Sequence, residues 1–177
     1  MWLRRIYDLD EVDRFVLGTV GLPGEREFYI QVRKAGQVLS FALEKGQAQA
    51  LVDRYKEMLR EAKSSHGAAP RDNEPLDTPI ESEFTLGVMA LTWQTDSQMI
   101  RFEGQAIVGD QGEEIIYHEL ASDELEGAPP ILRIRITTTQ ARSFIERATS
   151  VIKAGRVTCM FCGAPINANG HTCPRMN

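Results

Sequence analysis

The sequence contains no long apolar run. No stretch approaches the roughly 20 consecutive apolar residues that a membrane-spanning helix requires. The first segment turns acidic at Asp8, where a signal peptide would carry its apolar region. These two absences predict a cytoplasmic protein without a membrane span.

An excess of positive charge is also missing. The 20 lysines and arginines are outnumbered by 25 aspartates and glutamates, which gives a formal net charge of −5. This balance argues against a generic binder of polyanions. The charges are unevenly distributed, because residues 64–137 hold 4 basic and 14 acidic side chains, whereas residues 138–177 hold 5 basic and 1 acidic. This distribution has two interpretations. The charges lie on solvated loops and a solvated helix face, or the basic tail binds an anionic partner.

Sequence signals of catalysis are scarce. The chain has no Gly-x-Ser-x-Gly motif, no P-loop and no dinucleotide-binding glycine pattern. The segment Gly21-Leu22-Pro23-Gly24 joins two predicted strands, so no helix N-terminus follows it to hold a phosphate. His118, between Tyr117 and Glu119, is a candidate base, but a histidine beside a glutamate on an exposed strand is more often a surface residue. The sequence therefore favours a protein that is not an enzyme.

What the chain does contain is enough apolar residues for a core, at 42%. Alternation and helical spacing predict four strands followed by a helix, and then the same order again. The first set spans residues 3–8, 14–20, 27–34, 38–43 and 45–62; the second spans 84–93, 99–108, 113–120, 131–137 and 139–154. A polar connector with three prolines separates the two sets.

The two predicted helices also match in sequence at a fixed offset. Gln47 and Ala48 correspond to Gln140 and Ala141, which lie 93 positions later. The repeated order predicts an α+β fold of two tandem β-β-β-β-α units, each a curved antiparallel sheet with one helix across it. The predicted boundaries are 1–63 for the first unit, 64–82 for the acidic connector, 83–155 for the second unit and 156–177 for the tail.

This order of elements is similar to the Whirly and PUR-repeat folds, which bind single-stranded nucleic acid. Such binding requires basic and aromatic side chains along the sheet. The competing interpretation is that these are ordinary exposed strand faces in an acidic region. The candidate ligand-facing residues are Tyr29, Arg33, Trp93, Arg101, Arg133 and Arg135.

Cysteine is rare, and all three cysteines lie in the last 19 residues. Cys159 and Cys162 form a Cys-x-x-Cys-Gly knuckle, and His171 and Cys173 form a His-x-Cys pair whose side chains point to one face of a short strand. Three sulfurs and one nitrogen suit a tetrahedral Zn²⁺ ion, and four protein ligands leave no open position for catalysis. The sequence therefore predicts a structural zinc knuckle.

Three alternatives to zinc fit less well. A thioredoxin-like redox pair begins a helix, whereas this Cys-x-x-Cys follows one. An iron–sulfur cluster requires four cysteines and the chain has three. Free thiols leave the clustering of the cysteines unexplained.

Several further segments carry a family resemblance. These are residues 13–16, 18–21, 23–26 and 43–45, together with the terminal Cys-x-x-Cys-Gly-x-Pro and Gly-His-x-Cys-Pro. They resemble a bacterial family called domain of unknown function 3090 along nearly the whole chain. Met160 stands where the family often has proline. The resemblance implies the metal set Cys159, Cys162, His171 and Cys173, and it implies no catalytic residue.

Members of that family tend to be encoded beside a phosphoinositide-kinase-like protein and a histidine-phosphatase-like protein. The resemblance thus implies a phosphate-linked pathway with one of these proteins as a partner. We expect a non-enzymatic cytoplasmic binding or adaptor protein with a structural zinc site. The alternatives are a single-stranded nucleic-acid binder that uses its sheet faces, and an enzyme that cooperates with the kinase or phosphatase.

Overall fold

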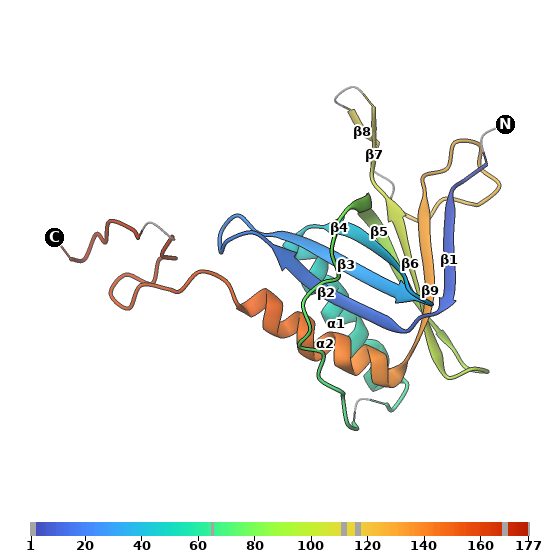
Figure 1. Ribbon diagram of the computed structural model, residues 1–177, viewed down its shortest axis with the longest axis horizontal. Coiled ribbons are helices and arrows are strands. Elements are labelled where there is room, and N and C mark those ends of the chain that lie inside the picture. The colour runs from blue at the N-terminus through green and yellow to red at the C-terminus, as the bar shows by residue number, and fades with distance from the viewer. Residues whose placement is uncertain (1–2, 65, 111–112, 116–117, 168–169, 177) are drawn as a thin grey trace.

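The fold is a mixed α+β arrangement around one large sheet (Figure 1). The structure is a computed structural model that describes residues 3–64, 66–110, 113–115, 118–167 and 170–176. The strands in this part of the chain are β1 (Ile6–Glu11), β2 (Arg14–Val20), β3 (Glu27–Lys34), β4 (Gln37–Leu43), β5 (Ser82–Gln94), β6 (Met99–Ala106), β7 (Val108–Asp110), β8 (Glu113–Ile115) and β9 (Ile131–Thr137). The helices are α1 (Lys45–Glu61) and α2 (Thr138–Lys153).

Seven of these strands form one sheet in the order β1-β9-β6-β5-β4-β3-β2. Neighbours are antiparallel except at β1–β9 and β4–β5, which are parallel pairs. The sheet is bent: Tyr7 on β1 packs edge-on against Phe41 on β4 with ring centroids 5.9 Å apart, although three strands lie between them in the sheet. The two edge strands, β1 and β2, are joined by only two residues, Val12 and Asp13, and Asp13 N donates to Arg33 O on β3 over 2.8 Å.

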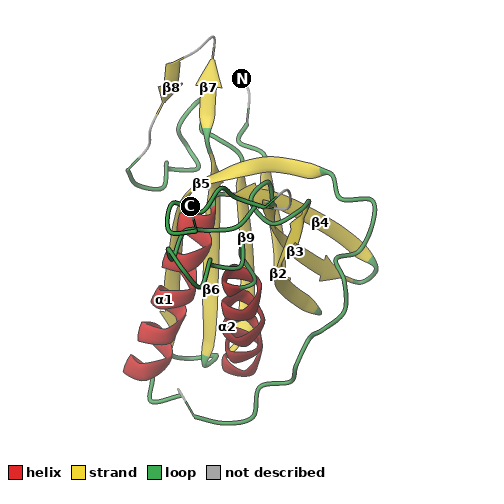
Figure 2. Ribbon diagram, turned by 90° about the vertical axis from the view of Figure 1, so that its left-hand side faces the viewer, coloured by secondary structure: helices red, strands yellow, loops and turns green. Residues whose placement is uncertain are grey.

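Both helices cover the same face of the sheet and lie side by side (Figure 2). Each begins with a capping box, formed by Glu44 with Gln47 in α1 and by Thr137 with Gln140 in α2. Their apolar faces close a single core. At its centre, four rings from β2, α1, β6 and α2 meet, and Phe15 stacks on Phe144 with centroids 4.6 Å apart. The rings belong to Phe15, Tyr55, Phe102 and Phe144.

The α+β class and most element positions agree with the sequence prediction, but purely antiparallel sheets in two tandem units are not confirmed. The parallel pair β4–β5 joins both halves in one sheet, and β1 pairs with β9 rather than with β2. The first strand also begins three residues later than predicted. The reason is Arg4, whose buried guanidinium donates to Pro129 O and Gln105 Oε1 and fixes the chain before β1.

The predicted strand over residues 113–120 is not part of the large sheet. Glu113–Ile115 pairs only with β7 in a small hairpin, residues 116 and 117 lie outside the described residues, and residues 118–120 form no strand. Gln105 Oε1 accepts a hydrogen bond from Ala121 N and holds the following segment as a loop. As a result β6 pairs directly with β9.

The connector between the two predicted units packs against the sheet and α2. Leu76 is buried, and Asp72 accepts hydrogen bonds from Arg14 on β2 and Arg147 on α2. None of the helices in the described residues has the length and apolar character needed to cross a bilayer.

Candidate metal centre and the charged sheet face

The tail that follows α2 brings its three cysteines and His171 to one point. The knuckle closes because Gly163 N donates to Cys159 O over 2.8 Å, and Gly163 adopts a left-handed φ of 74° that favours glycine. Cys159 N in turn donates to Ala164 O over 2.8 Å. These backbone bonds place the thiols of Cys159 and Cys162 on the same side of the turn.

The ligand atoms are spaced as a tetrahedral metal site requires. The Sγ atoms of Cys159 and Cys173 lie 3.8 Å apart, and Cys162 Sγ lies 3.2 Å from His171 Nε2. All four ligand atoms fall within 4.8 Å of one another. Ligands about 2.0–2.3 Å from a central zinc ion are roughly 3.3–3.8 Å from each other. The geometry therefore fits a four-coordinate ion, and it unites the four residues predicted from the sequence.

The two buried thiols have different environments. Backbone hydrogen bonds from Cys162 and Phe161 lower the pKa of the Cys159 thiol, whereas burial raises the pKa of Cys173. The amides of the knuckle thus favour a thiolate at Cys159, which is the form that binds a metal. Cys162 and His171 are half-buried at the surface of the site.

The tail projects from the end of α2, on the side of the molecule opposite the N-terminus (Figure 1). Its apolar side chains are largely outside the core: Met160 is 89% exposed and Val157 is 75% exposed. Phe161 is also exposed, and its carbonyl accepts a hydrogen bond from Arg175. The tail therefore presents apolar groups around the candidate metal site.

Three of the predicted ligand-facing arginines lie together on the sheet face that points away from the core. Arg101 and Arg135 are directly opposite each other on β6 and β9, and together with Arg133 they line a shallow pocket with Asp8 and Asp10. The other predicted residues lie elsewhere. Trp93 packs against the hydrophobic core, and Tyr29 on β3 donates its hydroxyl to Glu27.

Each of these arginines already has a carboxylate partner. Arg133 donates to both oxygens of Asp123 over 2.7 Å, and these bonds lower the pKa of Asp123. Arg101 pairs with Glu103, and Arg135 pairs with Asp10 and Glu11. Arg33 on β3 pairs with Asp77. The outer sheet face is thus a network of paired charges.

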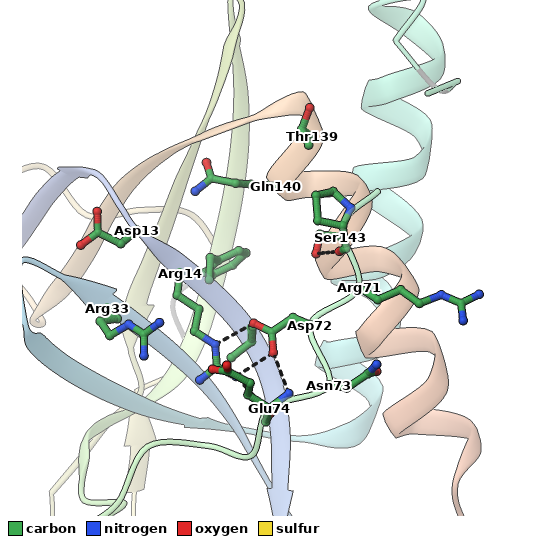
Figure 3. A pocket seen from close by; sticks show the side chains of 13 residues that line it. Asp13, Arg14, Arg33, Arg71, Asp72, Asn73, Glu74, Thr139, Gln140 and Ser143 are labelled. Carbon is green, nitrogen blue, oxygen red and sulfur yellow. Dashed lines mark hydrogen bonds and ion pairs between the residues drawn. The ribbon is translucent and has the colours of Figure 1, made fainter. Parts of the chain in front are cut away.

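A polar pocket of about 380 Å³ was not predicted from the sequence. It lies where the connector crosses β2 and the first turn of α2 (Figure 3). Arg14, which is only 6% exposed, donates through Nε and Nη2 to both carboxylate oxygens of Asp72 at 2.7 and 2.8 Å. Arg147 Nη1 donates to the same carboxylate over 2.8 Å. Arg14 and Arg147 lie 58 and 75 positions from Asp72 in the chain, so no local sequence pattern connects the three residues.

A protein-family model described as a protein of unknown function (DUF3090) matches residues 7–173. The match runs from β1 to the last of the four candidate ligands. Neither the curated proteins nor the solved structures contain a significant match.

Proposed function

The chain belongs to the DUF3090 family, and we propose that it is a cytoplasmic, non-enzymatic adaptor protein whose tail is built around a structural zinc ion. The observation that carries this proposal is the convergence of four ligand atoms within 4.8 Å. They lie in a segment that projects from the body and has few buried side chains of its own.

The donor set favours zinc. Thiolates and an imidazole are ligands that Zn²⁺ prefers, and three cysteines with one histidine form a common structural set. Because all four positions would be filled by protein, no position remains for a substrate or a reactive water. A tail of this size buries too little apolar surface to fold alone, so metal binding would supply its folding free energy.

An adaptor role is supported by what surrounds the site. The tail presents Met160 and Phe161 to solvent, as a surface for another protein would. His118, the candidate base, is exposed in a segment without regular structure. The proposed partners are the phosphoinositide-kinase-like or the histidine-phosphatase-like protein encoded beside members of this family, which would make the adaptor part of a phosphate-linked pathway.

The interpretation of two tandem units remains a proposal alongside this one. It is supported by the two capping boxes, whose residues Glu44 and Gln47 stand 93 positions before Thr137 and Gln140. The second candidate function, binding of single-stranded nucleic acid by the sheet, gains no support from the sheet arginines, because each is paired with a carboxylate.

The test has two parts. Elemental analysis of protein purified without chelators should find one zinc per chain, and Cys162→Ser should reduce it to below half. Thr172→Ser, between His171 and Cys173, is the matched control and should keep the metal. Isothermal titration with the kinase-like and phosphatase-like proteins should then show micromolar or tighter binding that the Cys162→Ser variant loses. Less than half a zinc per wild-type chain, or no binding to either protein, would contradict the proposal.

A further inference from the structure

The basic residues of the chain differ in whether a carboxylate pairs with them. Most of those on the sheet and the connector are paired with carboxylates, as described above, whereas Lys34, Arg60, Lys63 and Arg142 form no ion pair in the described part of the chain. A second group surrounds the junction between the body and the tail, and in the described part of the chain none of its members lies within ion-pairing distance of a carboxylate. This group, here called the junction cluster, consists of Arg26, Lys45, Lys153 and Arg156.

Two of these cations, Arg26 and Lys45, approach a common point although they come from different elements. A methyl group placed on Gly155 would lie 3.9 Å from Arg26 Nη2 and 4.0 Å from Lys45 Nζ, so both nitrogens approach the same point. Arg156 lies over the β2–β3 turn, with its Cδ 3.2 Å from where a methyl on Gly24 would be. Like charges gathered without counter-charges repel each other, and an anionic ligand removes that cost.

The fold holds these side chains in place. Arg26 Nη1 donates to Val151 O in the last turn of α2 over 3.1 Å, and its guanidinium lies 5.4 Å from the centre of the Phe28 ring. Arg156 Nη1 donates to Asn167 Oδ1 over 2.5 Å, a hydrogen bond within the tail that orients the Arg156 side chain. Lys45 stands at the first position of α1, where its ammonium stays in solvent.

Apolar side chains are exposed at the same end of the molecule. They come from the end of β2, from the β2–β3 turn and from the tail, and Arg156 in the tail contacts Gly24 in that turn. Together with the junction cluster they form a surface that is apolar and basic at once. The exposed residues are Val20, Leu22, Val157, Met160, Phe161 and Met176.

We propose that this surface docks an acidic amphipathic segment of a partner protein. The inference rests on the proposed adaptor function and names the chemistry of its partner. Apolar residues of the segment would cover Met160 and Phe161, and its carboxylates would pair with Lys45, Arg26 and Arg156. Exposed apolar groups beside unpaired cations are complementary to such a segment.

A protein segment fits better than a nucleic acid. Single-stranded nucleic acid binds through several stacking aromatic rings along a basic groove. Among the described residues of this surface, Phe161 is the one exposed aromatic side chain. The other exposed apolar side chains are valine, leucine and methionine. Nucleic acid is therefore an outcome of the test that would overturn the proposal.

The test uses the full-length zinc-loaded chain and a short fluorescein-labelled peptide with glutamate and leucine at helical spacing. Fluorescence anisotropy should show binding, and the same peptide with glutamine in place of glutamate should bind about tenfold more weakly. Lys45→Glu should weaken binding of the acidic peptide about fivefold to tenfold, and Met160→Ser should weaken it severalfold. The control is Arg60→Glu, which makes the same charge change at the other end of α1 and should alter the dissociation constant less than twofold.

Lys45→Glu places an acidic residue in the first helical turn, which is favourable for the helix, so loss of fold should not confuse the result. Equal weakening by Lys45→Glu and Arg60→Glu, or tighter binding of an oligothymidylate than of the peptide, would overturn the proposal. If the kinase-like or phosphatase-like protein binds wild type and Lys45→Glu equally, the docking surface is wrong while the adaptor function stands. If neither protein binds but the acidic peptide binds in a Lys45-dependent way, the surface stands and the proposed partners are wrong.

Discussion

Asp72 joins three separate parts of the chain, because its carboxylate accepts hydrogen bonds from Arg14 and Arg147. The bonds from Arg14 hold the pKa of Asp72 below its ordinary value of 3.8. A carboxyl with a lowered folded-state pKa contributes stability above the unfolded-state pKa and loses it as the pH falls through the folded-state pKa. This contribution is therefore fully present at pH 7 and disappears in acid below about pH 4.

We predict that Asp72→Asn lowers the free energy of unfolding by about 2–4 kcal/mol at pH 7, because buried Arg14 loses its nearest carboxylate and keeps only the longer pair with Asp77 at 3.5 Å. At pH 3 the difference from wild type should shrink. Urea unfolding followed by circular dichroism at both pH values measures it. The exposed Asp53→Asn, which removes a surface pair with Lys56, should cost less than about 0.5 kcal/mol. A loss of equal size at both pH values would show that the carboxylate charge is not the cause.

Gly18 on β2 is required by a close approach of the connector. A methyl group at this position would lie 2.5 Å from Leu76 Cγ, well inside contact distance. Gly18→Ala should therefore displace Leu76 and destabilise the protein by about 1–3 kcal/mol. The comparison is Gly46→Ala in the first turn of α1, where a methyl meets no atom within 4 Å and should leave stability unchanged or slightly raised. Thermal unfolding of both variants gives the answer, and similar melting temperatures for the two would refute the close-approach argument.

At the scale of elements, the sequence predicts the features that depend on residues close together in the chain. The alternation in residues 27–34 and the helical spacing of apolar residues in 45–62 and 139–154 predict β3, α1 and α2 within one or two positions. The Cys-x-x-Cys-Gly and His-x-Cys spacing specifies the metal ligands for the same reason, since the knuckle is a local turn.

Pairings between distant segments are not encoded in local spacing. The alternation of Tyr7 and Leu9 with Asp8 is the same whether β1 pairs with β2 or with β9. The sequence pattern alone therefore does not specify the partner of β1. The structure resolves this through Arg4, whose hydrogen bonds to the loop before β9 bring the first strand beside it. The Arg14–Asp72 pair was missed on the same grounds, because its residues are 58 positions apart.

The tail is an element whose order should depend on its metal. Few of its side chains are buried apart from Cys159 and Cys173, so the ligand set is its main internal contact. Chelation of zinc should make residues 156–177 sensitive to trypsin at Arg156 and Arg175 while the body stays resistant. Mass spectrometry of the digest with and without chelator measures this, and restored protection after zinc is added back is the control. A tail that resists trypsin equally in both states would count against a structural metal.

For the whole molecule, the body and the tail should behave as separate folding units. The hydrophobic core is formed by β1–β6, β9, α1 and α2, and among the described residues none of its members lies beyond Ile152. The contact that joins the tail to the body is that of Arg156 with Gly24 in the β2–β3 turn, whereas the hydrogen bond from Arg26 to Val151 O lies within the body and remains when the tail is removed.

Deletion of residues 156–177 should therefore leave the body folded. We expect a change in the free energy of unfolding below about 1 kcal/mol, which corresponds to roughly 2–4 °C in melting temperature for a chain of this size. Differential scanning calorimetry of the truncated and full-length chains, each with and without chelator, tests this. Chelation should shift neither main transition, because the metal acts only within the tail. A fall of more than about 10 °C on deletion would mean that the tail stabilises the core directly, and the adaptor proposal would then lose its premise of a tail free to engage a partner.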